Sequence, residues 1–407
     1  MPFGSLFRRH NKPEVIDNTT PTHIVFVVFG IGQETKHITN AEMLQLNINQ
    51  SISQYFTGDD ESLDSIKLIP ISWHNAIHSD KESWLAALRI GSEDPSQLGL
   101  WRTVSENLCL DVVLWCLQRH RQQIVAWVTR RMCEAYSNIL MDFPDFKGKV
   151  SVLGHSQGAQ IAHYILSRQC KPETPIEDAF NREGNMIHLI DHLLDNNVEP
   201  MFCHSLSESV TVPPLPFHIH TFISMGTALS MMMNLEEEVI PHKCIRVPVC
   251  ANWYSLLNKE DALAYRIEPL FDGKYVPMNP VVCYNPSTAS SRFSTFAKRF
   301  MNKADIEIAD IPVTAEENTS PKFSISSSSE DGVDYTAACD LDDEEEGQTS
   351  SVKRIVHQSP HDNDLNCRFD YVIEQRSFSR VIDGLKSHTS YWGSRPASIF
   401  LAEAFTT

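Results

Sequence analysis

The segment that most constrains the fold is residues 149–158, Lys-Val-Ser-Val-Leu-Gly-His-Ser-Gln-Gly. Its first half is the short β-branched run of a strand buried on both faces, and Gly154 to Gly158 follow the pattern Gly-x-Ser-x-Gly. Glycines on either side of Ser156 permit a tight strand-to-helix turn, because they carry no Cβ. Apolar residues at helical spacing follow the turn: Ala159, Ala162, Ile165 and Leu166. We therefore expect a nucleophilic serine, with the amide of Gln157 as an oxyanion donor. The alternative is an ordinary glycine turn.

Strand and helix patterns alternate before this turn. Residues 23–29 form a continuous apolar run, residues 41–56 have helical spacing, and residues 65–73 alternate as a strand does. This order predicts a β-α-β unit with parallel strands. We expect an α/β-hydrolase-like fold, in which a doubly wound, mostly parallel sheet carries helices on both faces.

A glycine loop, residues 30–33, closes the first predicted strand. In open α/β sheets, sites lie at the carboxyl ends of strands. Gly30 and Ile31 are therefore candidates for the second oxyanion amide. A phosphate-binding turn is the weaker interpretation, because the loop has neither Gly-x-Gly-x-x-Gly nor a P-loop lysine. A plain structural turn is the other alternative.

Composition excludes several classes of protein. The 407 residues carry a formal net charge of −18, which argues against nucleic acid as a partner. Ten cysteines without a Cys-x-x-Cys pair predict reduced thiols in the cytoplasm. No apolar stretch approaches the roughly 20 residues of a membrane span, and the first residues lack the apolar core of a signal peptide. We expect any membrane contact to be peripheral.

The chain divides into four predicted parts. Residues 1–20 form a flexible N-terminus, and residues 21–304 form the hydrolase-like core. Residues 305–366 are rich in serine and acidic residues, so they predict a disordered insertion. Residues 367–407 begin with a last strand and carry a candidate catalytic histidine.

The middle of the chain is less regular. Residues 81–140 are mostly helical in pattern, although residues 111–115 could be a short strand. Residues 169–216 are polar and irregular, which fits either a lid or a surface excursion. Strands are expected at residues 217–226 and 245–250, the second at an edge or bulge because it contains a proline.

A serine nucleophile needs a base within hydrogen-bond reach and an acid that orients the base. In α/β-hydrolases these residues follow in the order serine, acid, histidine. Asp261 and His388 each follow a predicted strand and satisfy this order. Asp261 could instead cap a helix. The competing residues are Glu260, Glu268 and Asp370 as acids and His361 as a base.

Several motifs in one order resemble the DDHD-domain family of intracellular phospholipases A1. They are Val27-Val-Phe-Gly-Ile-Gly-Gln33, Pro70-Ile-Ser-Trp-His74, the stretch 144–158, Ala264-Tyr-Arg-Ile-Glu-Pro269, Arg368-Phe-Asp-Tyr371, and Ser387-His388 with Tyr391-Trp392. The resemblance implies a serine hydrolase, an enzyme that cleaves the sn-1 acyl ester of glycerophospholipids such as phosphatidic acid. It also implies a cytoplasmic protein that associates peripherally with Golgi, endoplasmic reticulum or mitochondrial membranes.

The resemblance places the nucleophile on Ser156. Of the four residues that name the domain, the first three match Asp261, Asp370 and His388, and Pro396 stands near the fourth. Two carboxylates and an imidazole could bind a divalent metal. Triad chemistry needs no metal, and Asp261 and His388 cannot easily serve both purposes. We favour a Ser-Asp-His triad with no required cofactor.

Other features keep a second function open. Phe29 stands where the family usually has histidine, and Ala262 replaces a proline. With Pro396, these departures favour a catalytically inactive lipid-binding or membrane-trafficking protein of the same fold. Residues 290–303 mix phenylalanines with basic residues, which fits either contact with anionic lipid or a solvated helix. The expected partner is a phospholipid membrane surface, and the chain could form a homo-oligomer.

Overall fold

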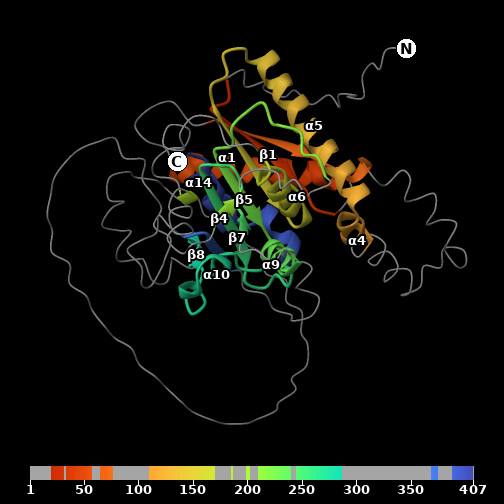
Figure 1. The fold of residues 1–407 in the computed structure, drawn as a ribbon. Coiled ribbons are helices and arrows are strands. Elements are labelled where there is room, and N and C mark those ends of the chain that lie inside the picture. The colour runs from red at the N-terminus through yellow and green to blue at the C-terminus, as the bar shows by residue number, and fades with distance from the viewer. Residues whose placement is uncertain are drawn as a thin grey trace, which may run out of the picture. The chain divides into compact units, whose positions relative to one another are not determined.

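The computed structural model describes much of the chain between residues 20 and 406. The described residues are 20–31, 34–56, 65–76, 110–169, 185–186, 199–201, 210–239, 244–286, 368–374 and 387–406. The helices and strands named below belong to one structural unit, residues 1–285 with 353–407. Figure 1 shows their arrangement.

Seven described strands form one parallel sheet in the order β2-β1-β3-β5-β7-β9-β8. The strands are β1 (His23–Val28), β2 (Ile66–Ile71), β3 (Lys149–His155), β5 (Thr221–Met225), β7 (Asn252–Asn258), β8 (Val281–Val282) and β9 (Asp370–Ile373). The predicted α/β class with a mostly parallel sheet is confirmed.

Helices cover both faces of this sheet (Figure 1). They are α1 (Glu34–Tyr55), α4 (Leu110–Cys116), α5 (Gln118–Asp142), α6 (Gln157–Leu166), α9 (Leu229–Val239), α10 (Glu268–Phe271) and α14 (Arg395–Thr406), with 3-10 turns η1 (His74–Ala76), η3 (Gly273–Tyr275) and η5 (Ser390–Gly393).

Strand β1 lies between two hydrophobic cores, one on each face of the sheet. Ile24, Phe26 and Val28 pack in the core under α5 and α6, whereas Val25 and Val27 pack in the core under α1 and α14. Successive side chains of a strand point to opposite faces, so a strand buried on both faces is apolar throughout. This is why residues 23–29 read as an uninterrupted hydrophobic run.

One predicted strand is misplaced. Residues 245–250 were expected to precede the candidate acid, but β6 (Cys244–Arg246) pairs with β4 (Glu199–Met201) in a separate two-stranded sheet. The strand before Asp261 is β7 instead. Pro248 follows β6 and has no N–H to donate to a sheet ladder. The chain therefore leaves that pairing before it enters the main sheet.

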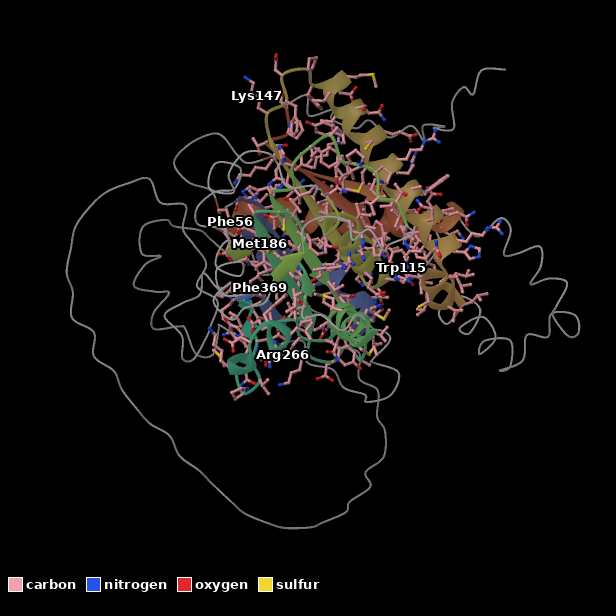
Figure 2. The ribbon with its side chains drawn as sticks, in the orientation of Figure 1. Phe56, Trp115, Lys147, Met186, Arg266 and Phe369 are labelled. Atoms are coloured by element: carbon pink, nitrogen blue, oxygen red, sulfur yellow. The ribbon has the colours of Figure 1, made fainter. Side chains whose placement is uncertain are left out.

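The short-strand alternative for residues 111–115 is also wrong, because these residues lie in helix α4. Trp115 of this helix, labelled in Figure 2, is buried in the core under α5 and α6. It packs edge-to-face on Tyr164 of α6, with 5.5 Å between ring centroids. Helix α14 was not predicted. No helix in the described ranges is long and apolar enough to cross a membrane. Several predicted features lie outside the described residues: the N-terminus 1–19, residues 81–109, most of 169–209, residues 290–303 and the insertion 305–366.

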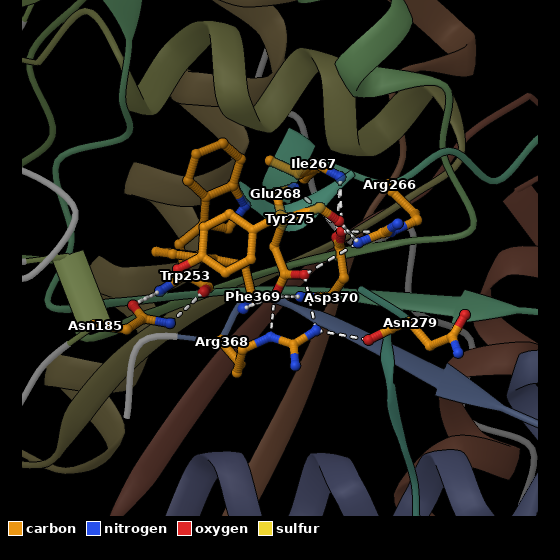
Figure 3. Close-up of polar contacts among 10 residues, drawn as sticks. All are labelled: Asn185, Trp253, Arg266, Ile267, Glu268, Tyr275, Asn279, Arg368, Phe369 and Asp370. Carbon is orange, nitrogen blue, oxygen red and sulfur yellow. Dashed lines mark hydrogen bonds and ion pairs between the residues drawn. The ribbon is translucent and has the colours of Figure 1, made fainter. Parts of the chain in front are cut away.

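Strand β9 is fastened by two carboxylates that bind each other's backbone (Figure 3). Glu268 accepts hydrogen bonds from the amides of Phe369 (2.8 Å) and Asp370 (3.1 Å), while Asp370 accepts from the amides of Ile267 (2.9 Å) and Glu268 (3.1 Å). Arg368 donates to both oxygens of Glu268, at 2.8 and 3.0 Å. We call Glu268, Arg368 and Asp370 the β9 clasp. All three are almost fully buried, so the clasp holds the last strand against α10.

Candidate active site

Ser156 occupies a strained turn between β3 and α6. Its φ of 55° and ψ of −127° make it the one non-glycine residue with positive φ in the described chain. Such a conformation costs about 1–3 kcal/mol and clusters at functional sites. A Cβ on Gly158 would lie 2.1 Å from the carbonyl oxygen of Val28, and one on Gly154 would lie 2.4 Å from Ala159 Cα. Both elbow glycines are therefore required sterically, and the predicted strand–turn–helix is present.

Ser156, His388 and Asp261 lie in one hydrogen-bonded chain. His388 Nε2 is 2.9 Å from Ser156 Oγ, and His388 Nδ1 is 3.0 and 3.1 Å from the carboxylate oxygens of Asp261. An ionised carboxylate can only accept, so Nδ1–H donates to it. Nε2 is then the acceptor for the serine hydroxyl. The residues follow β3, β7 and β9, whose carboxyl ends meet at one edge of the parallel sheet.

Asp261 is held as an anion. Burial alone would raise the pKa of this carboxyl, but the hydrogen bonds and charge of His388 lower it, as do donations from the Leu263 amide (2.9 Å) and the Tyr391 hydroxyl (2.8 Å). The net effect lowers the pKa of Asp261. The carboxylate can therefore orient the imidazole and stabilise a positive charge on it.

The turn that carries His388 is fixed from two sides. His155 Nε2 lies 2.9 Å from the backbone carbonyl of His388, an arrangement in which the imidazole must donate. Burial lowers the pKa of His155 to about 3, so it is neutral at pH 7. Asn258 Nδ2 donates to Ser390 Oγ at 3.0 Å and to the Ser387 carbonyl at 3.4 Å. The base is therefore positioned by the elbow and by the end of β7.

Two of the candidate oxyanion residues, Gly30 and Gln157, lie next to Ser156. A Cβ on Gly30 would lie 2.7 Å from Ser156 Cβ and 3.2 Å from its Oγ, so the loop after β1 runs directly against the serine. Ile31 follows in the same loop. Gln157 is the first residue of α6, where amides lack intrahelical acceptors. Its side chain donates to the Asp111 carbonyl at 3.3 Å, which ties α4 to the elbow. The rest of the loop, residues 32–33, lies outside the described residues.

Two of the three departures from the family pattern, Phe29 and Pro396, are well accommodated. Phe29 is buried and stacks on His37, with 4.5 Å between ring centroids, and packs on Trp392 at 5.0 Å. Its carbonyl accepts from Trp73 Nε1 at 2.8 Å, so the backbone beside the loop is anchored. Pro396 lies in the first turn of α14, where a missing amide removes no intrahelical hydrogen bond.

Asp370 does not join Asp261 and His388. It begins β9 and pairs in register with Ser255, whereas the site lies at the carboxyl ends of the strands. Its oxygens are used in the β9 clasp, where burial and the charge of Glu268 raise its pKa to about 7. Among the described residues, no three histidine, cysteine, aspartate or glutamate side chains could hold a metal. The structure therefore does not bring together Asp261, Asp370 and His388, the three residues of the alternative metal site.

No role was predicted for Tyr391, Asn258 or His155. His155 lies inside the elbow motif and Tyr391 inside a family motif, so their positions were visible although their contacts were not. Asn258 gave no signal, because β7 was not identified. Of the competing residues, Glu260 is exposed, Glu268 lies in the clasp, and His361 lies outside the described residues.

Comparison with curated proteins finds relatives of moderate identity. The chain is 24% identical over 293 residues to "Phospholipase DDHD1" of Homo sapiens, covering 64% of this chain and 31% of the relative. It is 28% identical over 231 residues to "Triacylglycerol hydrolase DDHD2" of Mus musculus, covering 54% and 31%. It is 26% identical over 174 residues to "SEC23-interacting protein" of Homo sapiens, covering 39% and 17%. These alignments span about a third or less of each relative. No family model and no solved structure matches the chain.

Proposed function

The relatives confirm the resemblance to the DDHD-domain family, and from this premise we propose that the chain is a serine hydrolase that cleaves acyl esters of glycerophospholipids. The observation that carries the proposal is the hydrogen-bonded chain of Ser156, His388 and Asp261. Two of the relatives are named as a phospholipase and a triacylglycerol hydrolase, which supports ester hydrolysis. The finer assignment is phospholipase A1 activity on substrates such as phosphatidic acid, in an α/β-hydrolase fold.

Acylation begins when Ser156 Oγ attacks the carbonyl carbon of the sn-1 ester. The hydroxyl proton moves to His388 Nε2, and Asp261 stabilises the resulting imidazolium. Negative charge develops on the former carbonyl oxygen. The amides of Gln157 and of the loop at Gly30 or Ile31 donate to this oxygen. The Gly30 backbone lies against Ser156, as this role requires.

Collapse of the tetrahedral intermediate breaks the ester C–O bond. His388 gives its proton to the departing glycerol oxygen, so the lysophospholipid leaves and the acyl group remains bound to Ser156 Oγ. Water then attacks the acyl carbon, gives a proton to His388, and releases the fatty acid while Ser156 is protonated again. No step requires a metal or an organic cofactor.

The substrate resides in a membrane, so the proposed partner is a phospholipid surface that the protein visits from the cytoplasm. The resemblance favours Golgi, endoplasmic reticulum or mitochondrial membranes. The alternative function is that of a catalytically inactive lipid-binding or membrane-trafficking protein of the same fold, and one relative is named for an interaction, as SEC23-interacting protein, and not for a reaction. That alternative predicts lipid binding without turnover.

A fluorophosphonate probe tests the proposal directly. We expect the purified protein to be labelled, and Ser156→Ala to abolish both labelling and phospholipid hydrolysis. Ser53→Ala, on the exposed face of α1, is a matched control that should behave like the wild type. Folded wild-type protein that takes up no label would contradict the proposal and favour the inactive lipid-binding alternative. Persistent labelling of Ser156→Ala would assign the nucleophile elsewhere.

A further inference from the structure

The hydrogen-bonded chain continues beyond Asp261. Tyr391 Oη lies 2.8 Å from Asp261 Oδ2, and the backbone amide of Asn258 lies 2.8 Å from the same hydroxyl oxygen. Tyr391 is fully buried. The sequence of contacts therefore runs from the end of β7 through a phenol to the candidate acid.

The hydroxyl can point in only one direction. A backbone amide donates and never accepts, so the phenol oxygen must accept from Asn258. Its one hydrogen is then directed at Asp261. Burial and the charge of Asp261 raise the pKa of Tyr391 well above its ordinary value, so the phenol stays protonated and remains a donor.

The ring of Tyr391 is clamped in this position. Gly226 has a φ of 55°, and a Cβ there would lie 2.7 Å from Tyr391 Cε2 and 2.9 Å from Asp261 Oδ2. The backbone after β5 thus closes over both groups. On another side, the His155 ring meets the Tyr391 ring edge-on, with 5.9 Å between centroids.

Tyr391 and His388 lie on one turn and donate to one oxygen. Asp261 Oδ2 accepts from His388 Nδ1 at 3.0 Å and from Tyr391 Oη at 2.8 Å. We propose that Tyr391 is a positioning residue for hydrolysis, whose hydroxyl fixes the Asp261 carboxylate in the orientation that holds His388 ready to accept the serine proton. This inference rests on the proposed function of Ser156, His388 and Asp261.

The change Tyr391→Phe removes the donor and keeps the ring. A hydrogen bond to a charged group corresponds to a rate loss of about 10- to 100-fold when the interaction is needed in the transition state. We expect this loss in kcat with an unchanged KM, because Tyr391 acts through Asp261 and not on the substrate. The hydroxyl is one of the groups that lower the pKa of Asp261, so its loss makes this carboxylate a stronger partner for the imidazolium. We therefore expect the acid limb of the rate–pH profile to move to higher pH.

The test measures kcat, KM and the rate–pH profile on a soluble ester, with thermal unfolding as the check on folding. Tyr136→Phe is the matched control, since Tyr136 lies on α5 and packs on Phe217 and Phe146. A second variant places 3-fluorotyrosine at position 391. Fluorine strengthens the phenol as a donor, so the acid limb should move to lower pH, opposite to the shift in Tyr391→Phe.

The outcomes separate this inference from the proposed function. Opposite shifts of the acid limb support the positioning role, because a merely structural role would not move the limb in both directions. If the wild type is labelled by fluorophosphonate but both variants at position 391 keep the kcat and pH profile of Tyr136→Phe, the inference alone fails. A uniform loss of activity at every pH, in proportion to lost stability, would assign a structural role and overturn it. Folded wild-type protein without labelling would contradict the proposed function itself.

Discussion

The close approach of Gly30 to Ser156 gives the sharpest test of the site. In Gly30→Ala, the new Cβ would lie 2.7 Å from Ser156 Cβ, 3.0 Å from the His155 carbonyl oxygen and 3.2 Å from Ser156 Oγ. Non-bonded carbon atoms normally approach to about 3.5–4.0 Å. The loop after β1 and the elbow must therefore separate by about 1 Å, because the two nearest atoms, Ser156 Cβ and the His155 carbonyl oxygen, cannot move without the backbone.

The added methyl group would therefore move the proposed oxyanion donor in this loop away from Ser156. A misplacement of about 1 Å costs about 100-fold in rate, and overpacking costs about 1–3 kcal/mol of folding free energy. We expect kcat of Gly30→Ala to fall about 100-fold. Gly273→Ala is the matched control, because a Cβ at Gly273 meets nothing within 4 Å. It should leave kcat unchanged and stability within about 1 kcal/mol of wild type.

The assay combines the rate of fluorophosphonate labelling with hydrolysis of a soluble ester, on protein whose folding is checked by circular dichroism. Labelling and hydrolysis should both be slower in Gly30→Ala than in the wild type. Both rates should be unchanged in Gly273→Ala. Wild-type rates in a folded Gly30→Ala protein would refute the reasoning, since the loop could then not lie against the serine.

Two further predictions concern stability, measured by urea unfolding. Glu268→Ala leaves Arg368 buried without its carboxylate, so we expect the free energy of unfolding to fall by about 3–5 kcal/mol. The control Glu374→Ala removes an exposed ion pair with Lys259, 3.6 Å long, and should cost less than about 1 kcal/mol. Equal losses in the two variants would contradict a stabilising role for the β9 clasp. Burial, with the charge of Arg168, lowers the pKa of His163 from 6.5 to about 3, so unfolding takes up a proton between these values and stability falls as the pH drops below about 6.5. His163→Gln keeps a donor and should reduce the slope of stability against pH by about 1.4 kcal/mol per unit near pH 5 to 6; an unchanged slope would show that His163 is not buried neutral.

Local patterns were sufficient for much of the sheet. The apolar run of β1, the helical spacing of α1 and the elbow of residues 149–158 depend on neighbours in sequence, so their periodicity identifies them. Asp261 and His388 could be chosen by chain order, because parallel strands bring their carboxyl ends to one edge. The hydrogen bonds that join these residues to Ser156 required the structure.

Contacts between residues far apart in sequence leave no local pattern that could predict them. Residues 245–250 and β7 are both short and partly apolar, and only pairing with β5 and β9 identifies β7 as the strand of the main sheet. Tyr391 and Asn258 meet across 133 residues of sequence. Asp370 matched a family motif, but its role in the β9 clasp depends on Glu268, 102 residues away. The spacing of apolar residues in the sequence gives no information about contacts over such separations.

The position of His388 explains how the acid and base can lie far apart in sequence without losing their geometry. They are 127 residues apart, yet His155 donates to the His388 carbonyl and Asn258 donates to Ser387 and Ser390 on either side of it, so these hydrogen bonds fix the turn that carries the base. Doubling the length of a connection costs only about 0.6 kcal/mol in loop-closure entropy. Breaking a buried charge pair costs about 3–5 kcal/mol. Changes in the length of the chain between β8 and β9 should therefore cost far less stability than a single substitution in the clasp, and the turn of His388 should keep its hydrogen bonds to His155 and Asn258.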